Sequence, residues 1–195
     1  VYLCEWPTPM IGQFDEAFLD LPDAALVSCM RTHQKYFPLY NGDSLSNQFV
    51  VVADNVTPEN KDRILSGNQR VLKARLSDLR FFWDADQQKG LESMSKGLDR
   101  VVFQRNGGTM ADKVARIQAL TPYILTESGL NASLADCLRA AVLSKADLCS
   151  QMVGEMPGLQ GLMGGLYARQ AGESEAVAEG IEGHYQPKQE QDEAP

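Results

Sequence analysis

The sequence predicts an α+β protein: a small β-α-β portion at the start of the chain, followed by a mainly α-helical bundle. Two observations support this fold class. Extended, alternating runs are confined to residues 1–56, whereas from Thr57-Pro58 onward the apolar residues recur with the helical period of about 3.6. In addition, 44% of the 195 residues are apolar, which is enough to build a packed core.

The first portion is expected to hold two strands. Val1–Trp6 alternates like a strand that Pro7 and Pro9 confine to a sheet edge or a bend. Phe49–Ala53 is a β-branched run typical of a buried strand.

A helix is predicted between these two strands, over Ala24–His33. Pro22 fits its first turn. The helix should end before Tyr36-Phe37-Pro38, because the residue before a proline is pushed toward extended geometry. Asn41-Gly42 then supplies a turn into the second strand.

The remainder of the chain is expected to be helical, with Gly107-Gly108 and Gly129 as breaks. The predicted helices lie at about residues 59–83, 88–104, 109–127, 132–153, 157–168 and 173–184. The predicted divisions of the chain are residues 1–56 for the α+β portion, 57–87 for a connecting basic helix, 88–185 for the helical domain and 186–195 for a disordered tail.

The most informative segment is Gly67–Trp83, a cationic helix in a chain whose formal net charge is -8. On a wheel of roughly 100° per residue, one stripe holds the cations Arg63, Arg70, Lys73 and Arg80. The opposite, core-facing side holds Ile64, Leu65, Val71, Leu72, Leu76 and Leu79. Because the whole chain is acidic, any contact with nucleic acid must come from a local patch such as this stripe. Composition alone favours a solvated helix face over a nucleic-acid site.

Arg75 breaks this pattern, because it projects toward the apolar sector of the wheel. An unpaired guanidinium would be costly to desolvate there. We therefore expect Arg75 to form a structural ion pair with a carboxylate such as Asp78, or to meet a neighbouring domain.

Side chains suited to catalysis or metal binding are scarce. The only histidines, His33 and His184, lie near opposite ends of the chain, so no multi-histidine metal centre is expected. The four cysteines lack Cys-x-x-Cys spacing, and no Gly-x-Ser-x-Gly, Walker or Rossmann motif occurs. We predict no catalytic residue and no metal ligand in this chain.

Three other features are better explained by structure than by chemistry. The glycines of Gly158–Gly165 recur every three residues, which indicates close helix packing rather than phosphate binding. Phe81-Phe82-Trp83 is expected to anchor its helix in the core rather than to stack on bases. The helical carboxylates are expected to be solvated or ion-paired rather than catalytic; they are Asp136, Asp147 and Glu155, with Arg139 and Lys145 close at hand.

Nothing in the sequence indicates secretion or membrane insertion. No charged-then-apolar leader opens the chain, and no apolar run approaches the roughly 18 residues of a membrane helix. Scattered, reduced cysteines fit a cytoplasmic protein. Because the chain starts at Val1 with a strand-like run, we expect it to be a fragment of a longer protein.

Several ordered runs of residues resemble one known family. The runs are Met30–Pro38, Gly67–Asp78 and Phe81-Phe82-Trp83, followed by Lys145–Leu148, Met152–Glu155 and Leu159–Gly164. In this order they resemble the beta subunit of the bacterial two-subunit glycyl-tRNA synthetase, over Glu5–Tyr185. The chain would be only about a third of such a subunit. The sequence after Tyr185 lacks the continuation that the family leads us to expect.

The resemblance implies a division of labour between two subunits. The alpha subunit carries the class II active site, which uses ATP and Mg²⁺ to activate glycine, while the beta subunit binds and positions tRNA(Gly). The chain itself would then be inactive alone and would hold no cofactor. Its implied partners are the alpha subunit, tRNA(Gly) and the remainder of the beta subunit, with no membrane.

The resemblance also implies two domain types. The first portion looks like the end of a domain similar to the B3/B4 module of phenylalanyl-tRNA synthetase, and the helical remainder looks like the start of an HD-like bundle. HD hydrolases bind a metal through a His, a His-Asp pair and a further Asp. The resemblance places this pair at Ala146-Asp147, which lacks the histidine, so the metal site is expected to be degenerate.

We therefore expect a non-catalytic module that positions tRNA and serves as a scaffold for the alpha-beta complex. Its phosphate contacts would come from Arg70, Lys73 and Arg80, with Arg63 peripheral, because RNA backbones are recognised largely through phosphates and shape. Two alternatives remain open. One is a metal-dependent HD phosphohydrolase, and the other is a pure subunit-docking module whose basic stripe binds an acidic protein surface.

Overall fold

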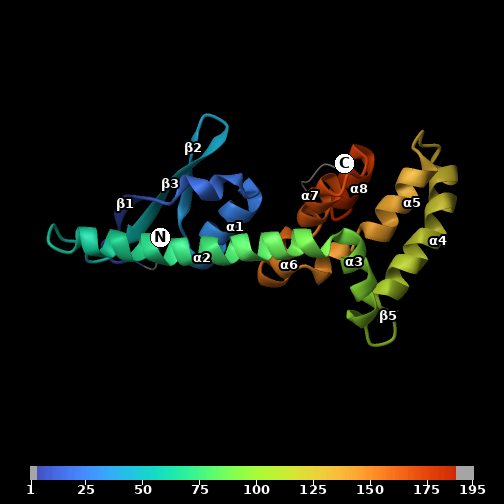
Figure 1. Cartoon of the computed structure of the whole chain (residues 1–195), viewed down its shortest axis with the longest axis horizontal. Helices are drawn as coiled ribbons and strands as arrows, with labels where there is room; N and C mark the ends of the chain where they lie inside the picture. The colour runs from blue at the N-terminus through green and yellow to red at the C-terminus, as the bar shows by residue number, and fades with distance from the viewer. Residues whose placement is uncertain (1–3, 188–195) are drawn as a thin grey trace. The chain divides into compact units, whose positions relative to one another are not determined.

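The computed structural model describes residues 4–187, apart from the side chain of His33, and the chain divides into two compact units. The first unit extends to Trp83 and the second begins at Asp84, so that helix α2, Lys61–Lys89, contributes residues to both (Figure 1). The predicted tail lies outside the described residues from position 188 onward. Within residues 4–187, no helix combines the length and the apolar character that crossing a membrane requires.

The first unit contains a three-stranded antiparallel sheet with the strand order β1-β3-β2. Its strands are β1, Thr8–Gln13; β2, Phe37–Asn41; and β3, Ser44–Ala53. The predicted turn at Asn41-Gly42 is confirmed, since Gly42 has a φ of +62° in the short connection between β2 and β3. A positive φ of this kind is readily adopted by glycine.

Of the predicted strand Val1–Trp6, positions 1–3 lie outside the described residues and residues 4–6 are not in a strand, since β1 begins only at Thr8. Pro9 lies inside β1, opposite Val52 of β3. This is compatible with the ladder because β1 is an edge strand and a proline lacks only its N–H. Strand β2 was missed, and it lies at the other edge of the sheet with Pro38 inside it.

Two helices precede β2: the 3-10 helix η1, Glu16–Asp20, and helix α1, Asp23–Gln34. The Asp15 carboxylate accepts a hydrogen bond from the backbone N–H of Ala17 and so caps η1. Helix α1 ends at Lys35, whose left-handed φ of +56° turns the chain away before Pro38. The predicted helix is thus confirmed.

The core of this unit is built from apolar side chains that are fully removed from solvent: Leu26, Met30, Phe49, Leu72 and Leu76. Tyr36 stacks on Phe49 with 4.8 Å between ring centroids. A Cβ atom at Gly12 would lie 2.6 Å from the Phe49 ring. The glycine in β1 therefore makes room for Phe49, the largest of the fully buried side chains.

The second unit holds the end of α2, a small hairpin and a set of helices. The hairpin strands are β4, Val102–Gln104, and β5, Gly108–Thr109. The α-helices are α3, Leu91–Ser95; α4, Met110–Ser128; α5, Leu134–Leu143; α6, Gln151–Glu155; α7, Leu162–Gln170; and α8, Glu175–Gly183. The 3-10 helices are η2, Lys96–Arg100; η3, Ala146–Cys149; and η4, Pro157–Leu159. Helix α4 packs against α5, α5 against α8, and α8 against α7.

The predictions for helix α4 are confirmed at both ends. Thr109 and Asp112 form a capping box, in which each side chain accepts a hydrogen bond from the other residue's backbone N–H. Gly129 ends the helix with a φ of +67°.

Two predicted helices are wrong, one because a local hairpin interrupts it and the other because distant residues do. The helix predicted at 88–104 gives way to η2 and β4, where Val102–Gln104 pairs with the strand after Gly107. The helix predicted at 132–153 stops at Leu143 and resumes as α6 after η3. At that point the N–H groups of Gln151 and Met152 donate to the Asp86 carboxylate instead of continuing the helix.

The packing interpretation of the glycine run is confirmed for Gly164 and Gly165, whereas a Cβ atom at Gly158 would meet nothing within 4 Å. A Cβ atom at Gly164 would lie 2.7 Å from Ile181 Cγ2, and one at Gly165 would lie 3.0 Å from the Ala178 carbonyl oxygen. Gly161, with a φ of +83°, separates η4 from α7, so the helix expected at 157–168 begins only at Leu162. The glycines therefore allow α7 to approach α8 closely.

Candidate functional site

The basic stripe of helix α2 lies on the surface of the first unit. Arg63, Arg70 and Lys73 are exposed, and none of the three forms an ion pair within residues 4–187. The buried side of the helix is held by Leu72, Leu76, Leu79 and Trp83, which are at most 6% exposed. The apolar side of α2 thus fixes the direction in which these three cations project.

Arg70 and Lys73 line one shallow groove of about 340 Å³ beside the end of strand β1. Gln69 fixes the wall of this groove, since its Nε2 donates to the Gln13 carbonyl oxygen at 3.1 Å. The carboxylate in the groove, Asp15, already caps η1. The groove can therefore present two cationic side chains to one phosphate or to two neighbouring phosphates.

Arg63 lines a different groove, of about 470 Å³, together with Tyr36, Asn68 and Val71. The Tyr36 hydroxyl donates to Asn68 Oδ1 at 2.6 Å, and burial raises the pKa of this tyrosine. This bond ties α2 to the start of β2. Arg63 thus lines a different groove from Arg70 and Lys73, and its peripheral contact with RNA stays a prediction.

Arg80 differs from the other three cations because its guanidinium is already engaged. It is half-buried and forms a two-pronged ion pair with Asp20, in which Nη1 lies 2.8 Å from Oδ2. Its Nη2 also donates to the Ala17 carbonyl oxygen at 2.5 Å. The hydrogen bonds from Arg80 hold the pKa of Asp20 below its usual value. The RNA contact predicted for Arg80 stays a prediction, and the observed contacts tie α2 to η1.

Two details of the predicted helix wheel are wrong. Arg75 is exposed rather than directed into the core, and Val71 is 46% exposed. Both lie roughly 60 to 100° around the helix from Leu72, at about 100° per residue, so they border the buried stripe on its open side. The ion pair of Arg75 with Asp78 stays a prediction. Of the aromatic run, Trp83 is the buried anchor, whereas Phe81 is 64% exposed.

Asp147, at the position expected for the HD pair, is fully buried in the second unit. Its Oδ2 accepts hydrogen bonds from the backbone N–H groups of Gly161, at 2.6 Å, and Gly164, at 3.2 Å. Burial raises the pKa of this carboxyl, and Oδ1 has no hydrogen-bond partner among the described residues.

These surroundings do not fit a divalent cation. The Asp147 carboxylate meets amide donors and the positive charge of Lys145, whereas a metal would require further oxygen or imidazole ligands. Within residues 4–187, no group of three or more His, Cys, Asp and Glu side chains is placed to hold a metal ion. Asp147 instead fixes the loop that enters α7.

Lys145, His184 and Tyr185 form a polar cluster beside Asp147. The Lys145 Nζ atom lies 2.6 Å from His184 Nε2 and 3.6 Å from the centroid of the Tyr185 ring. His184 Nδ1 lies 2.5 Å from the Ile181 carbonyl oxygen, which can only accept, so Nδ1 carries the proton and Nε2 accepts from Lys145.

Burial and mutual repulsion shift the pKa values of this cluster. Burial, and secondly the charge of Lys113, lowers the pKa of Lys145 to about 8. Burial lowers the pKa of His184 to about 4, to which the charges of Lys145 and Lys113 contribute. At neutral pH the imidazole is therefore neutral and acts as an acceptor.

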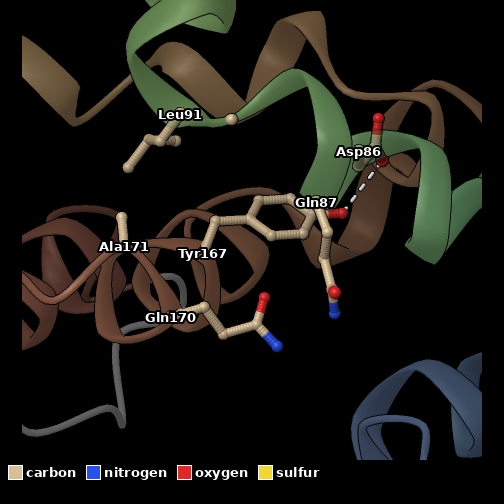
Figure 2. Close-up of a pocket in the computed structure, with 7 residues that line it drawn as sticks. Asp86, Gln87, Leu91, Tyr167, Gln170 and Ala171 are labelled. Carbon is tan, nitrogen blue, oxygen red and sulfur yellow. Dashed lines mark hydrogen bonds between the residues drawn. The ribbon is translucent and has the colours of Figure 1, made fainter.

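A third buried polar group, Asp86, lines a cavity of about 480 Å³ with Gln87, Leu91, Tyr167 and Gln170 (Figure 2). The Tyr167 hydroxyl donates to Asp86 Oδ2 at 2.9 Å, as the dashed line in Figure 2 shows. Burial, and next the Asp86 charge, raises the pKa of Tyr167. Asp86 is 1% exposed and caps the start of α6, so its role is structural.

The roles of Lys145, His184 and Asp86 were not predicted from the sequence. Lys145 was expected only as an ion-pair partner of nearby carboxylates, and no role was predicted for His184. Their proximity depends on a contact between residues 39 positions apart, which no local pattern encodes. A usable signal was the occurrence of the charged residues Lys145 and Asp147 in the mainly apolar run 140–149.

Comparison with known proteins places the chain in one family. The profile described as "Glycyl-tRNA synthetase beta subunit" matches residues 1–195. Proteins named "Glycine--tRNA ligase beta subunit" from Janthinobacterium sp., Chromohalobacter salexigens and Cereibacter sphaeroides are 45%, 41% and 47% identical to it. These matches cover 99%, 99% and 95% of the chain. The chain spans only 27% or 28% of the length of these relatives, somewhat less than the third that was expected. The chain belongs to the glycyl-tRNA synthetase beta subunit family.

Proposed function

We propose that this chain is a non-catalytic part of a glycine-tRNA ligase, and that it binds and positions tRNA(Gly) while glycine is attached elsewhere in the enzyme. The ATP- and Mg²⁺-dependent chemistry would take place on the alpha subunit. The observation that carries this proposal is the exposed pair Arg70 and Lys73 in one groove, in a member of this family.

Local positive charge is what would attract the tRNA to this chain. The chain as a whole carries -8 and repels phosphate, so productive contact must be made where cations are concentrated and not already neutralised. Arg70 and Lys73 meet both conditions, whereas Arg80 is neutralised by Asp20. Exposed cations of this kind contribute through phosphate contacts and counterion release.

The proposal is tested in the full-length enzyme with the double variant Arg70→Ala/Lys73→Ala. We expect the dissociation constant for tRNA(Gly) to rise about tenfold, a loss of about 1.4 kcal/mol, while the rate of glycyl-adenylate formation without tRNA stays unchanged. Lys61→Ala is a matched control, because Lys61 is exposed on the same helix but lies roughly 180° around it from Arg70 at 100° per residue. Equal tRNA affinity in the double variant and the wild type would contradict the proposal.

The structure offers no support for the alternative of a metal-dependent phosphohydrolase, because the surroundings of Asp147 do not fit a metal ion. Docking of another part of the beta subunit is favoured as a second function by a separate observation. Ile11, Val50 and Phe37 lie side by side across the three strands of the sheet, and Ile11 and Phe37 are 58% and 55% exposed. An apolar row of this kind is suited to a protein contact.

The occupant we propose for this apolar row is the part of the beta subunit that lies outside the chain, since the relatives are far longer than the chain. A photoreactive amino acid at Phe37 in the full-length enzyme should form crosslinks within the beta subunit. Crosslinks to the alpha subunit or to tRNA instead would contradict this assignment.

A further inference from the structure

A second cavity, of about 500 Å³, lies in the helical unit between α4, α5 and α8. Its polar lining includes Lys113, Lys145 and His184, and its apolar lining includes Ile117, Cys137 and Ala140. No aspartate or glutamate is among the residues that line it. The volume is in the range of small-molecule sites, which are roughly 300 to 1,000 Å³.

The two lysines of this cavity lack the ion pairs that comparable cations of the same unit possess. Arg139 and Arg169, which are also partly covered, each pair with two glutamates. Within residues 4–187, Lys113 and Lys145 have no such partner: the Lys113 Nζ atom lies over the Phe103 ring, and Lys145 faces His184 and Tyr185. The Asp147 charge acts on Lys145, but this carboxylate is buried and holds backbone amides.

The polar groups of the cavity that remain available to a ligand are hydrogen-bond donors. One Nζ–H of Lys145 donates to His184 Nε2 and the ammonium group packs on the Tyr185 ring, which leaves donor capacity without an acceptor among the described residues. The Ser144 and Thr121 hydroxyls already donate to the Ala141 and Ile117 carbonyl oxygens. The protons available to a guest are therefore those of the two ammonium groups.

We propose that this cavity binds a small molecule that carries an oxyanion, a phosphate or a carboxylate, on an apolar body. The oxyanion would lie between Lys113 and Lys145, where it would relieve their repulsion, and the apolar body would contact Ile117, Cys137 and Ala140. The site lies in the second unit, away in sequence from the cations of α2, so it does not depend on the proposed tRNA contacts.

The test measures dissociation constants of four probes by calorimetry with the full-length protein. Phenyl phosphate and benzoate represent the two oxyanions, inorganic phosphate lacks the apolar body, and benzyl alcohol lacks the charge. We expect phenyl phosphate or benzoate to bind at least tenfold more tightly than inorganic phosphate and benzyl alcohol, because both halves of the guest contribute. The tighter of the two identifies the oxyanion.

Variants assign the binding to this cavity. Lys113→Met and Lys145→Met should each raise the dissociation constant of the tighter probe at least tenfold, whereas Arg116→Met should change it less than twofold. Arg116 lies on the same helix as Lys113 but outside the cavity lining, so it controls for charge. Lys113 is only half-buried, so its variant remains informative if Lys145→Met fails to fold. The inference is overturned if neither oxyanion binds, if benzyl alcohol binds equally well, or if Lys113→Met leaves the affinity unchanged.

Discussion

Single buried polar residues hold together the segments on which this protein's structure depends. Asp86 is the clearest case, since one carboxylate accepts hydrogen bonds from two backbone N–H groups of α6 and from the Tyr167 hydroxyl. Asp147 does the same for the loop that enters α7. Because a buried donor without a partner loses its hydration with no compensation, each of these carboxylates should contribute more than a typical surface hydrogen bond.

The substitution Asp86→Asn should lower the free energy of unfolding by about 1 to 3 kcal/mol, because the amide group would turn a donor toward the donors of α6 or Tyr167. Urea unfolding of the variant measures this change. Asp84→Asn is the control, since Asp84 is exposed on the same helix. Equal losses in the two variants would show that the buried contacts of Asp86 are not responsible.

His184 makes stability depend on pH. Its pKa is lowered from 6.5 to about 4 in the folded state, chiefly by burial, so the unfolded chain binds this proton more readily. The contribution of His184 to the free energy of unfolding should therefore be fully present above pH 6.5 and should be lost as the pH drops from 6.5 toward 4. His184→Gln keeps an acceptor for Lys145 but does not titrate.

Urea unfolding between about pH 7.5 and about pH 4.5 tests this expectation. The loss of stability on acidification should be smaller in His184→Gln than in the wild type, and the difference should appear below pH 6.5. Parallel pH profiles for the two proteins would show that His184 titrates normally.

At the scale of elements, the contact of α7 with α8 depends on the absence of side chains. A Cβ atom at Gly165 would meet the Ala178 carbonyl oxygen at 3.0 Å and Glu182 Cβ at 2.9 Å. Backbone of a neighbouring helix cannot rotate away as a side chain can. The two helices would have to separate to accommodate even one methyl group.

Gly165→Ala should therefore destabilise the protein by about 1 to 3 kcal/mol. Gly154→Ala is its matched control, because Gly154 is also helical but a Cβ atom added there would have no neighbour within 4 Å. The control should gain about 0.4 to 1 kcal/mol through the reduced entropy of the unfolded chain. Thermal unfolding measures the stability of both variants. A stabilised Gly165→Ala variant would contradict the close approach of α7 to α8.

At the scale of the whole molecule, the acidic net charge and the exposed cations of the basic stripe act against each other. The chain carries 26 acidic and 18 basic residues, so an approaching RNA meets overall repulsion and local attraction. The dependence of tRNA affinity on salt separates these two contributions, because only neutralised phosphates release counterions.

In the full-length enzyme, the slope of log affinity against log salt concentration should become shallower by about 1.5 in Arg70→Ala/Lys73→Ala, since two phosphate contacts are lost. Titrations at several salt concentrations measure the slope. Lys61→Ala removes the same kind of charge from the opposite side of α2 and should leave the slope close to that of the wild type. An unchanged slope in the double variant would show that Arg70 and Lys73 do not contact phosphates of the tRNA.

The sequence by itself determined the features that depend on neighbours along the chain. Helix α1 ended where Tyr36-Phe37-Pro38 predicted, Asn41-Gly42 made a turn, and Gly129 ended α4. The α+β class and the exposed cations Arg70 and Lys73 also followed from periodicity. These features are local, because caps, turns and helical faces depend on residues within one or two turns.

Only the tertiary structure decided what distant residues do to one another. The helix predicted at 132–153 was divided because its N–H groups meet Asp86, more than 60 positions earlier. In the same way, Arg80 is engaged in an ion pair with Asp20 and is not available as an exposed cation. Lys145 forms a hydrogen bond with His184, which lies 39 positions away. Local propensities for competing conformations differ by about 1 kcal/mol or less per residue, so one buried, charge-assisted contact is enough to override them.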